Sequence, residues 1–205
     1  HMRPARPPRA PARGQTWAAF VHNHAPTIWA CDFLHVIDPG FRSRCAFVIV
    51  ALGSRRVVHV GVTRHPTDAW VAQQLREATP FGTAPRFLIR DNDGRCGTQC
   101  AHVAAGSRID VLRTPIRAPR ANATCERFLG SVRRECLDHL LIMHAGHLRR
   151  VLRAYCAYHN AARPHQGLEQ TIPDAAGRIP ALSPAAPIVS TPVLGGLHHD
   201  YRRAA

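Results

Sequence analysis

Two long apolar segments, residues 28–37 and 45–52, constrain the fold more than any other part of the sequence. The second is apolar at nearly every position, which is typical of a strand buried on both faces of a sheet. The first carries one acid, Asp32, in its middle. A third strand is expected at residues 56–63, after a tight turn at Gly53 and Ser54. Together the three segments predict an antiparallel meander inside a layered domain.

Helical and strand patterns alternate after the meander. A helix is expected at residues 66–77, a short strand at 86–90, a short helix near 98–105 and a fifth strand at 109–112. Strands separated by helices arrive through crossover connections and can therefore be parallel. The order of elements predicts an α/β fold with a five-stranded mixed sheet flanked by helices.

Two more helices are expected in the second half of the chain. The first opens near Pro119 and Asn122, carries apolar residues at helical spacing and is expected to end near Met143. The second spans residues 146–158, and a polar loop follows at 160–168. We therefore expect three parts: a disordered Pro/Arg-rich tail at 1–16, one domain at 17–176, and a Pro/Ala-rich C-terminal tail at 177–205 with little regular structure.

The formal net charge of +14 and the isoelectric point of about 11.1 point to a polyanionic partner, nucleic acid first. Every strong cation is arginine, but alanine and proline are also frequent, so a coding bias explains the arginines equally well. No apolar run approaches the roughly 18 residues of a membrane span. The seven cysteines are odd in number and scattered through apolar segments, which favours reduced thiols and a cytoplasmic protein.

Three carboxylates fall on separate predicted elements. An acid in the middle of an apolar strand is costly to bury without compensation, although Asp32 could simply face water. Asp91 follows the fourth strand, and Glu126 lies in the first turn of a helix. If the three converge at one edge of the sheet, they offer the hard oxygen ligands that Mg²⁺ or Mn²⁺ prefers.

Several short motifs, in order, carry a family resemblance over about residues 16–176. The chain resembles the integrase catalytic core of bacterial insertion-sequence transposases, which has a ribonuclease-H-like fold and a DDE triad. The matching segments are Trp29-Ala30-Cys31-Asp32-Phe33, Ile89-Arg90-Asp91-Asn92-Asp93-Gly94, Pro119-Arg120-Ala121-Asn122 with Glu126, and Tyr158-His159-Asn160-Ala161-Ala162-Arg163-Pro164-His165.

The resemblance implies that Asp32, Asp91 and Glu126 are catalytic and bind two Mg²⁺ or Mn²⁺ ions. Water would cut a transposon end, and the freed 3′-hydroxyl would attack target DNA. Such enzymes usually work as homo-oligomers on DNA. The residues expected to contact DNA are Arg120, Asn122, Arg127, Arg133 and Arg134.

Several alternatives remain open at this point. Asp93 is a rival to Asp91 as a metal ligand, and Cys96 stands where relatives often have an aromatic residue. A zinc site at Cys96, Cys100 and His102 lacks the second Cys/His pair that structural zinc sites require. His22-Asn23-His24 spells a nuclease motif without its usual surroundings.

The function itself also has alternatives. The helical DNA-end-binding domain that usually precedes such a core is not recognised in residues 1–16. The chain could therefore be an inactive DNA-binding remnant of a transposase. A third reading is a ribonuclease-H-like nuclease that cuts DNA without joining it.

Overall fold

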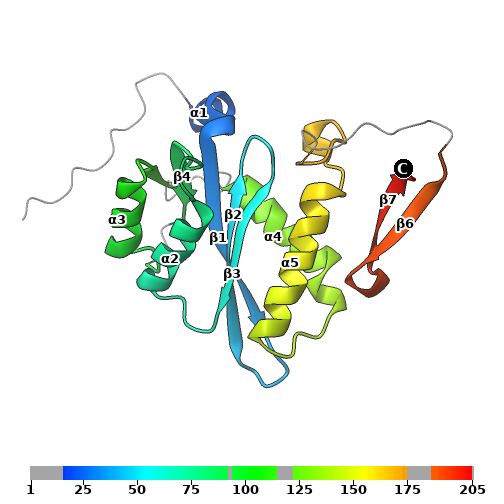
Figure 1. Cartoon of the computed structure of the whole chain (residues 1–205). Helices are drawn as coiled ribbons and strands as arrows, with labels where there is room; N and C mark the ends of the chain where they lie inside the picture. Colours follow the sequence, from blue (N-terminus) through cyan, green and yellow to red (C-terminus); the bar gives the residue numbers. More distant parts are fainter. Residues whose placement is uncertain (1–15, 92–93, 115–121, 175–185, 205) are drawn as a thin grey trace, which may run out of the picture.

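A five-stranded sheet lies between two layers of helices, and a C-terminal hairpin packs beside the second layer (Figure 1). This computed structural model describes residues 16–91, 94–114, 122–174 and 186–204. The strand order is β3-β2-β1-β4-β5. Within the described residues, no helix is both long and apolar enough to cross a lipid bilayer.

The predicted antiparallel meander is confirmed. It consists of β1 (Ile28–Ile37), β2 (Ser43–Ala51) and β3 (Val57–Thr63), and β2 is buried along almost its whole length. The turn between β2 and β3 packs tightly against the 3₁₀ turn η1 (Ala25–Thr27), because a Cβ at Gly53 would lie 2.9 Å from the Cα of Pro26. Glycine is therefore required where this turn meets η1.

The remaining strands are parallel to β1, as their helical crossovers predict. β4 (Phe87–Arg90) pairs with β1, and β5 (Asp110–Arg113) pairs with β4. Helices α2 (Asp68–Ala78) and α3 (Thr98–Gly106) cover one face of the sheet. The Asp68 carboxylate accepts the backbone N–H groups of Gly97, Gln99 and Cys100, which fixes the start of α3.

The other face of the sheet is covered by α4 (Ala123–Glu135) and α5 (Ala145–Ala161), with α1 (Trp17–His24) packed at its margin. The apolar stripe expected on α4 is buried there. It consists of Cys125, Phe128, Leu129 and Val132. Burial of this stripe holds α4 against β1 and β2.

Two details of the prediction were wrong. Helix α4 ends at Glu135, because Cys136 leaves helical geometry, and the 3₁₀ turn η2 (Leu137–His139) follows. This break lets Ile142 reach the core, where only 3% of it is exposed. Helix α5 continues to Ala161, so Asn160 belongs to its last turn, not to a loop.

The C-terminal region also has more regular structure than expected. Strands β6 (Ile188–Val193) and β7 (His198–Arg203) form an antiparallel hairpin around the 3₁₀ turn η5 (Leu194–Gly196). The His198 ring stacks on the Tyr158 ring of α5, with a centroid distance of 4.7 Å and an interplanar angle of 12°. Aromatic packing thus anchors a segment whose composition predicted a tail.

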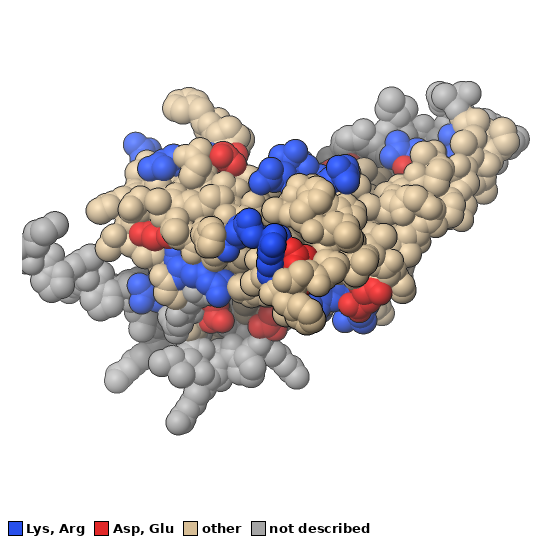
Figure 2. All heavy atoms as spheres, turned by 90° about the horizontal axis from the view of Figure 1, so that it is seen from below, with Lys and Arg blue, Asp and Glu red and all other residues tan. Residues whose placement is uncertain are grey.

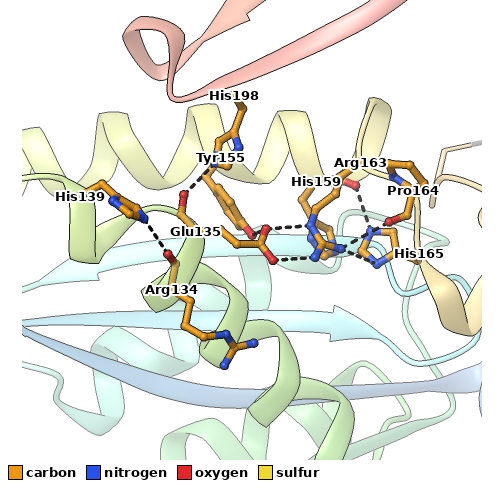
Figure 3. A network of polar contacts seen from close by, with 9 residues as sticks. All are labelled: Arg134, Glu135, His139, Tyr155, His159, Arg163, Pro164, His165 and His198. Atoms are coloured by element: carbon orange, nitrogen blue, oxygen red, sulfur yellow. Dashed lines mark hydrogen bonds and ion pairs between the residues drawn. The ribbon is translucent and has the colours of Figure 1, made fainter.

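Glu135, the last residue of α4, joins α4, α5, the segment after α5 and the hairpin (Figure 3). Its carboxylate accepts two hydrogen bonds from the Arg163 guanidinium, at 2.8 and 2.6 Å, and one from the Tyr155 hydroxyl at 2.8 Å. The His198 ring donates to the Glu135 carbonyl oxygen at 2.8 Å. A bidentate arginine pair of this kind is both strong and directional.

We expect Glu135→Gln to flatten the acid dependence of stability. Burial raises the pKa of Glu135, but hydrogen bonds from Arg163 and Tyr155 lower it by more, so its pKa lies below the ordinary 4.5. A lowered folded-state pKa gives stability that is present above the unfolded pKa and is lost as pH falls through the folded value. At about pH 7 the variant should lose about 1–2 kcal/mol, because the pair is partly solvent-screened.

Urea unfolding at a series of pH values measures this effect. Below about pH 4.5 the wild-type protein should lose more unfolding free energy than Glu135→Gln. Glu169→Gln, at an exposed position after η3 (Gln166–Leu168), serves as the control and should follow the wild-type pH dependence. If the unfolding free energies of wild type and Glu135→Gln change in parallel with pH, the expectation is contradicted.

Candidate active site

Asp32 lies on β1, and Asp91 directly follows the neighbouring parallel strand β4. The last pair of the β1–β4 register is Ala30 with Ile89, and each aspartate comes two residues after its member of that pair. Adjacent strands are roughly 4.8 Å apart, and residues two apart share a face. Since Ala30 and Ile89 belong to the core under α4 and α5, both aspartates are placed on the side of the sheet that α4 covers.

Each aspartate has a defined hydrogen bond. Asp32 is half-buried and its carboxylate accepts the backbone N–H of Phe33 at 2.7 Å. Asp91 is exposed and accepts the hydroxyl of Thr114 at 2.7 Å, just after β5. Thr114 has no motif signal of its own, so sequence reasoning missed it. Each of these bonds orients one carboxylate oxygen.

Glu126 lies in the first turn of α4, and two contacts tie α4 along β1. The Asn122 side-chain amide donates to the Cys31 carbonyl oxygen at 3.2 Å, one residue before Asp32. At the other end, the Arg133 guanidinium donates to the His35 carbonyl oxygen at 3.0 Å. Asn122 thus holds the start of α4 against β1 and makes no side-chain cap of its own helix.

The buried Cys125 thiol lies in the first turn of α4, directly before Glu126. Burial raises the pKa of Cys125, and the Asp32 and Glu126 carboxylates contribute further to the rise. The bond from Asn122 to the Cys31 carbonyl oxygen independently places the start of α4 beside the residue before Asp32. Glu126 itself is exposed beside this point.

The three carboxylates share one region but do not form a closed ligand set. Within the described ranges, no three His, Cys, Asp or Glu side chains lie close enough together to hold a metal ion. Carboxylates repel one another when no cation lies between them. Asp93, the rival ligand, and Arg120, a predicted DNA contact, fall outside the residues that the structure describes.

The other predicted residues are placed as follows. Arg127 and Arg134 are exposed on α4, and the Arg127 Nε–H donates to the Ala123 carbonyl oxygen at 3.0 Å. All seven cysteines are free and buried, as the sequence predicts for reduced thiols. Cys96, just before α3, and Cys100, within α3, belong to the core cluster on this face of the sheet, whereas His102 is exposed. His22, Asn23 and His24 lie on α1.

Comparison with known proteins agrees with this architecture. Residues 107–173 match the integrase core domain family. The structure superposes on the catalytic core domain of HTLV-2 integrase, solved in complex with magnesium, with a TM-score of 0.57 at 16% identity, covering 71% of this chain and 93% of that one. This segment of the chain, residues 107–173, therefore resembles an integrase core domain. Integrase catalytic cores have the ribonuclease-H-like fold, which confirms the predicted fold class.

Two curated relatives come from bacterial insertion elements. The uncharacterized 31.7 kDa protein of IS407 from Burkholderia multivorans is 29% identical over 167 residues, which cover 78% of this chain and 59% of that protein. The uncharacterized 39.2 kDa protein of IS476 from Xanthomonas euvesicatoria is 28% identical over 160 residues, 77% of this chain and 44% of that protein. The chain therefore matches only about half the length of these relatives.

A chain of a second solved structure has the same fold. The chain superposes on the simian T-cell lymphotropic virus intasome in complex with PP2A regulatory subunit B56 gamma, with a TM-score of 0.60 at 16% identity. The match covers 87% of this chain and 67% of that chain. At this identity the likeness concerns the fold alone.

Proposed function

We propose that this integrase core catalyses metal-dependent cleavage of DNA strands and their transfer to target DNA in transposition. The observation that supports the proposal is that Asp32 and Asp91 each come two residues after the paired Ala30 and Ile89, which lie on the face of the sheet that α4 covers. Glu126 enters from the first turn of α4, which Asn122 ties to β1. The insertion-element relatives support transposition as the process.

The three acids fit a divalent cation by their donor chemistry. Asp32, Asp91 and Glu126 would hold Mg²⁺ or Mn²⁺ through carboxylate oxygens, which are the ligands these hard ions prefer. The HTLV-2 core was solved with magnesium. Bound divalent cations supply charge neutralisation at the phosphate and lower the pKa of the attacking hydroxyl group.

The protein's own part in the reaction is positioning. In cleavage, a water oxygen bonds to phosphorus while the bond from phosphorus to the 3′-oxygen breaks, and that oxygen leaves as a 3′-hydroxyl. In strand transfer, this 3′-oxygen bonds to a target phosphorus and displaces the target's 3′-oxygen. The rigid sheet and the tied α4 hold the acids in place for both in-line displacements.

The surface charge supports a DNA partner. On the face shown in Figure 2, arginine side chains gather across the middle, with acidic side chains between and around them. We propose that Arg127, Arg133 and Arg134 of α4 contact phosphates, together with Asn122 and Arg120 near the start of the helix. We also propose a homo-oligomeric assembly on DNA, as the dimeric and trimeric forms of the HTLV-2 core and the viral intasome suggest.

The proposal is tested by incubating labelled duplex DNA with the protein and Mn²⁺. We expect nicked and joined products from wild type, and neither from Asp32→Asn. Asp110→Asn, an exposed acid at the start of β5, makes the same chemical change elsewhere and should cut like wild type. Nicks without joining would favour a nuclease, and binding without nicking would favour an inactive remnant.

A further inference from the structure

A hollow of about 220 Å³ lies between α4, the β2–β3 turn and the segment after α5, and the proposed chemistry does not use it. Thr124, Arg127 and Ser131 of α4 line it, with Arg55 from the turn and Gln166 and Gly167 from η3. The turn and the C-terminal end of α5 lie at the same end of the molecule (Figure 1). Three separate segments thus build one hollow, whose lining combines polar side chains with the apolar Val50 and Phe128.

The hollow opens on a different flank of α4 from Glu126. Helical residues advance by about 100° each, so Glu126 points about 200° away from Thr124. Thr124, Phe128 and Ser131, at positions i, i+4 and i+7, form one row along the hollow. A group bound here is therefore separate from a group held by the three carboxylates.

Two arginines give the hollow its charge. Arg55 donates to the Thr124 hydroxyl, and among the described residues neither Arg55 nor Arg127 pairs with a carboxylate. Burial lowers the pKa of Arg55, and the nearby charge of Arg127 lowers it further, so the two cations lie close enough to repel. The other arginine of the lining, Arg163, is already neutralised by its bidentate bond to Glu135 (Figure 3).

Of the two histidines in the lining, His159 bonds to Arg55, and burial lowers the pKa of both His159 and His165. The His159 ring Nε2 bonds to the Arg55 carbonyl oxygen at 3.2 Å, and burial lowers the pKa of His159 to about 4. Arg55 has a φ of +61°, a left-handed conformation that is uncommon outside glycine. A strained arginine held by a buried histidine is a costly arrangement, and such strain is concentrated at functional sites.

We propose that this hollow, the Arg55–Arg127 pocket, binds a backbone phosphate of DNA as a second contact beside the catalytic centre. Arginine forks and hydroxyl groups are the donors that phosphate oxygens accept. An anion between Arg55 and Arg127 removes their mutual repulsion, with Thr124 and Ser131 as further donors. The assignment to DNA rests on the proposed function, whereas the phosphate site itself does not.

The test uses two separate readouts on Arg55→Gln and Arg127→Gln. In the first, inorganic phosphate is titrated while amide resonances of Thr124 and Ser131 are followed by NMR. We expect saturable shifts in wild type that are at least about threefold weaker in each variant, since each arginine supplies charge-assisted bonds. Arg153→Gln, at an exposed position on α5, is the matched control and should behave like wild type.

The second readout is duplex affinity as a function of salt, measured without divalent cations so that cleavage plays no part. Each variant should lower the slope of log affinity against log salt by about 1. If phosphate causes no shifts of the amide resonances, or equal shifts in wild type and both variants, the proposed phosphate site is overturned. If the phosphate-induced NMR shifts depend on the two arginines but the salt dependence of duplex affinity is the same in wild type and variants, the assignment to DNA is overturned. The pocket would then be a site for a free phosphate.

Folding of the variants is checked in the same samples. Arg55→Lys keeps the charge but loses the planar fork, so phosphate affinity should lie between those of wild type and Arg55→Gln. If Arg55→Lys and Arg55→Gln bind phosphate equally weakly while both unfold at a lower temperature than wild type, Arg55 is structural and the proposal fails. If cleavage fails in wild type but phosphate binds as expected, the pocket stands and the proposed function does not.

Discussion

Glu126→Gln is expected to abolish DNA cleavage while leaving duplex binding nearly intact. The amide has almost the same shape as the carboxylate but lacks the negative charge that a divalent cation requires. Loss of a direct ligand should cost at least the 10- to 100-fold that loss of an outer-shell partner typically costs. Affinity for duplex DNA depends mainly on arginine–phosphate contacts, so it should change by less than about twofold.

Cleavage rates with Mn²⁺ and equilibrium binding without it give the two readouts. Glu169→Gln makes the same change at an exposed position outside the proposed site and should keep both properties. A Glu126→Gln protein that cuts at the wild-type rate would remove Glu126 from the catalytic set. Equal loss of binding and cleavage would show that the helix, and not the carboxylate, had been damaged.

Asn160→Ala is expected to destabilise the protein by about 3 kcal/mol, which lowers Tm by about 6–12 °C for a chain of this size. Strand β3 lies at an edge of the sheet, and the Asn160 side-chain amide pairs with the backbone of this strand at Val57. Its oxygen accepts the Val57 N–H and its nitrogen donates to the Val57 carbonyl oxygen, both at 2.9 Å. Removing the amide leaves two buried backbone groups unpaired.

Thermal and urea unfolding measure the loss. Asn160→Asp is the sharper test, because it keeps the shape and the acceptor but places an oxygen against the Val57 carbonyl oxygen. It should therefore be destabilised as well. Arg153→Ala, an exposed change on the same helix, should stay within about 0.5 kcal/mol of wild type. If Asn160→Ala stays within that range too, the side-chain bridge to the edge strand contributes no net stability.

The layered fold could be predicted from the sequence because its signals are local. The apolar run that forms β2 is recognisable without knowledge of its partners, and the helical crossover before β4 makes a parallel strand possible. Asp32 was conspicuous because an acid is costly inside an apolar strand. The triad Asp32, Asp91 and Glu126 was proposed from motifs, and its role in catalysis stays a prediction.

Contacts between distant segments could not be predicted in this way. The bond from Thr114 to Asp91, the pairing of Asn160 with Val57 and the approach of Arg55 to Arg127 each join residues far apart in the chain. No periodicity or spacing encodes such pairs, because they depend on how the layers pack. The end of α4 at Glu135 and the hairpin β6–β7 were missed for the same reason.

The sequence by itself determined which segments are buried, and therefore the α/β class and the strands that carry the acids, since burial follows from local apolar pattern. Only the tertiary structure decided which face of the sheet Asp32 and Asp91 occupy, where α4 stops, and that two arginines with no carboxylate partner among the described residues meet beside it. Those outcomes follow from packing between layers, where each side chain's neighbours come from remote parts of the chain.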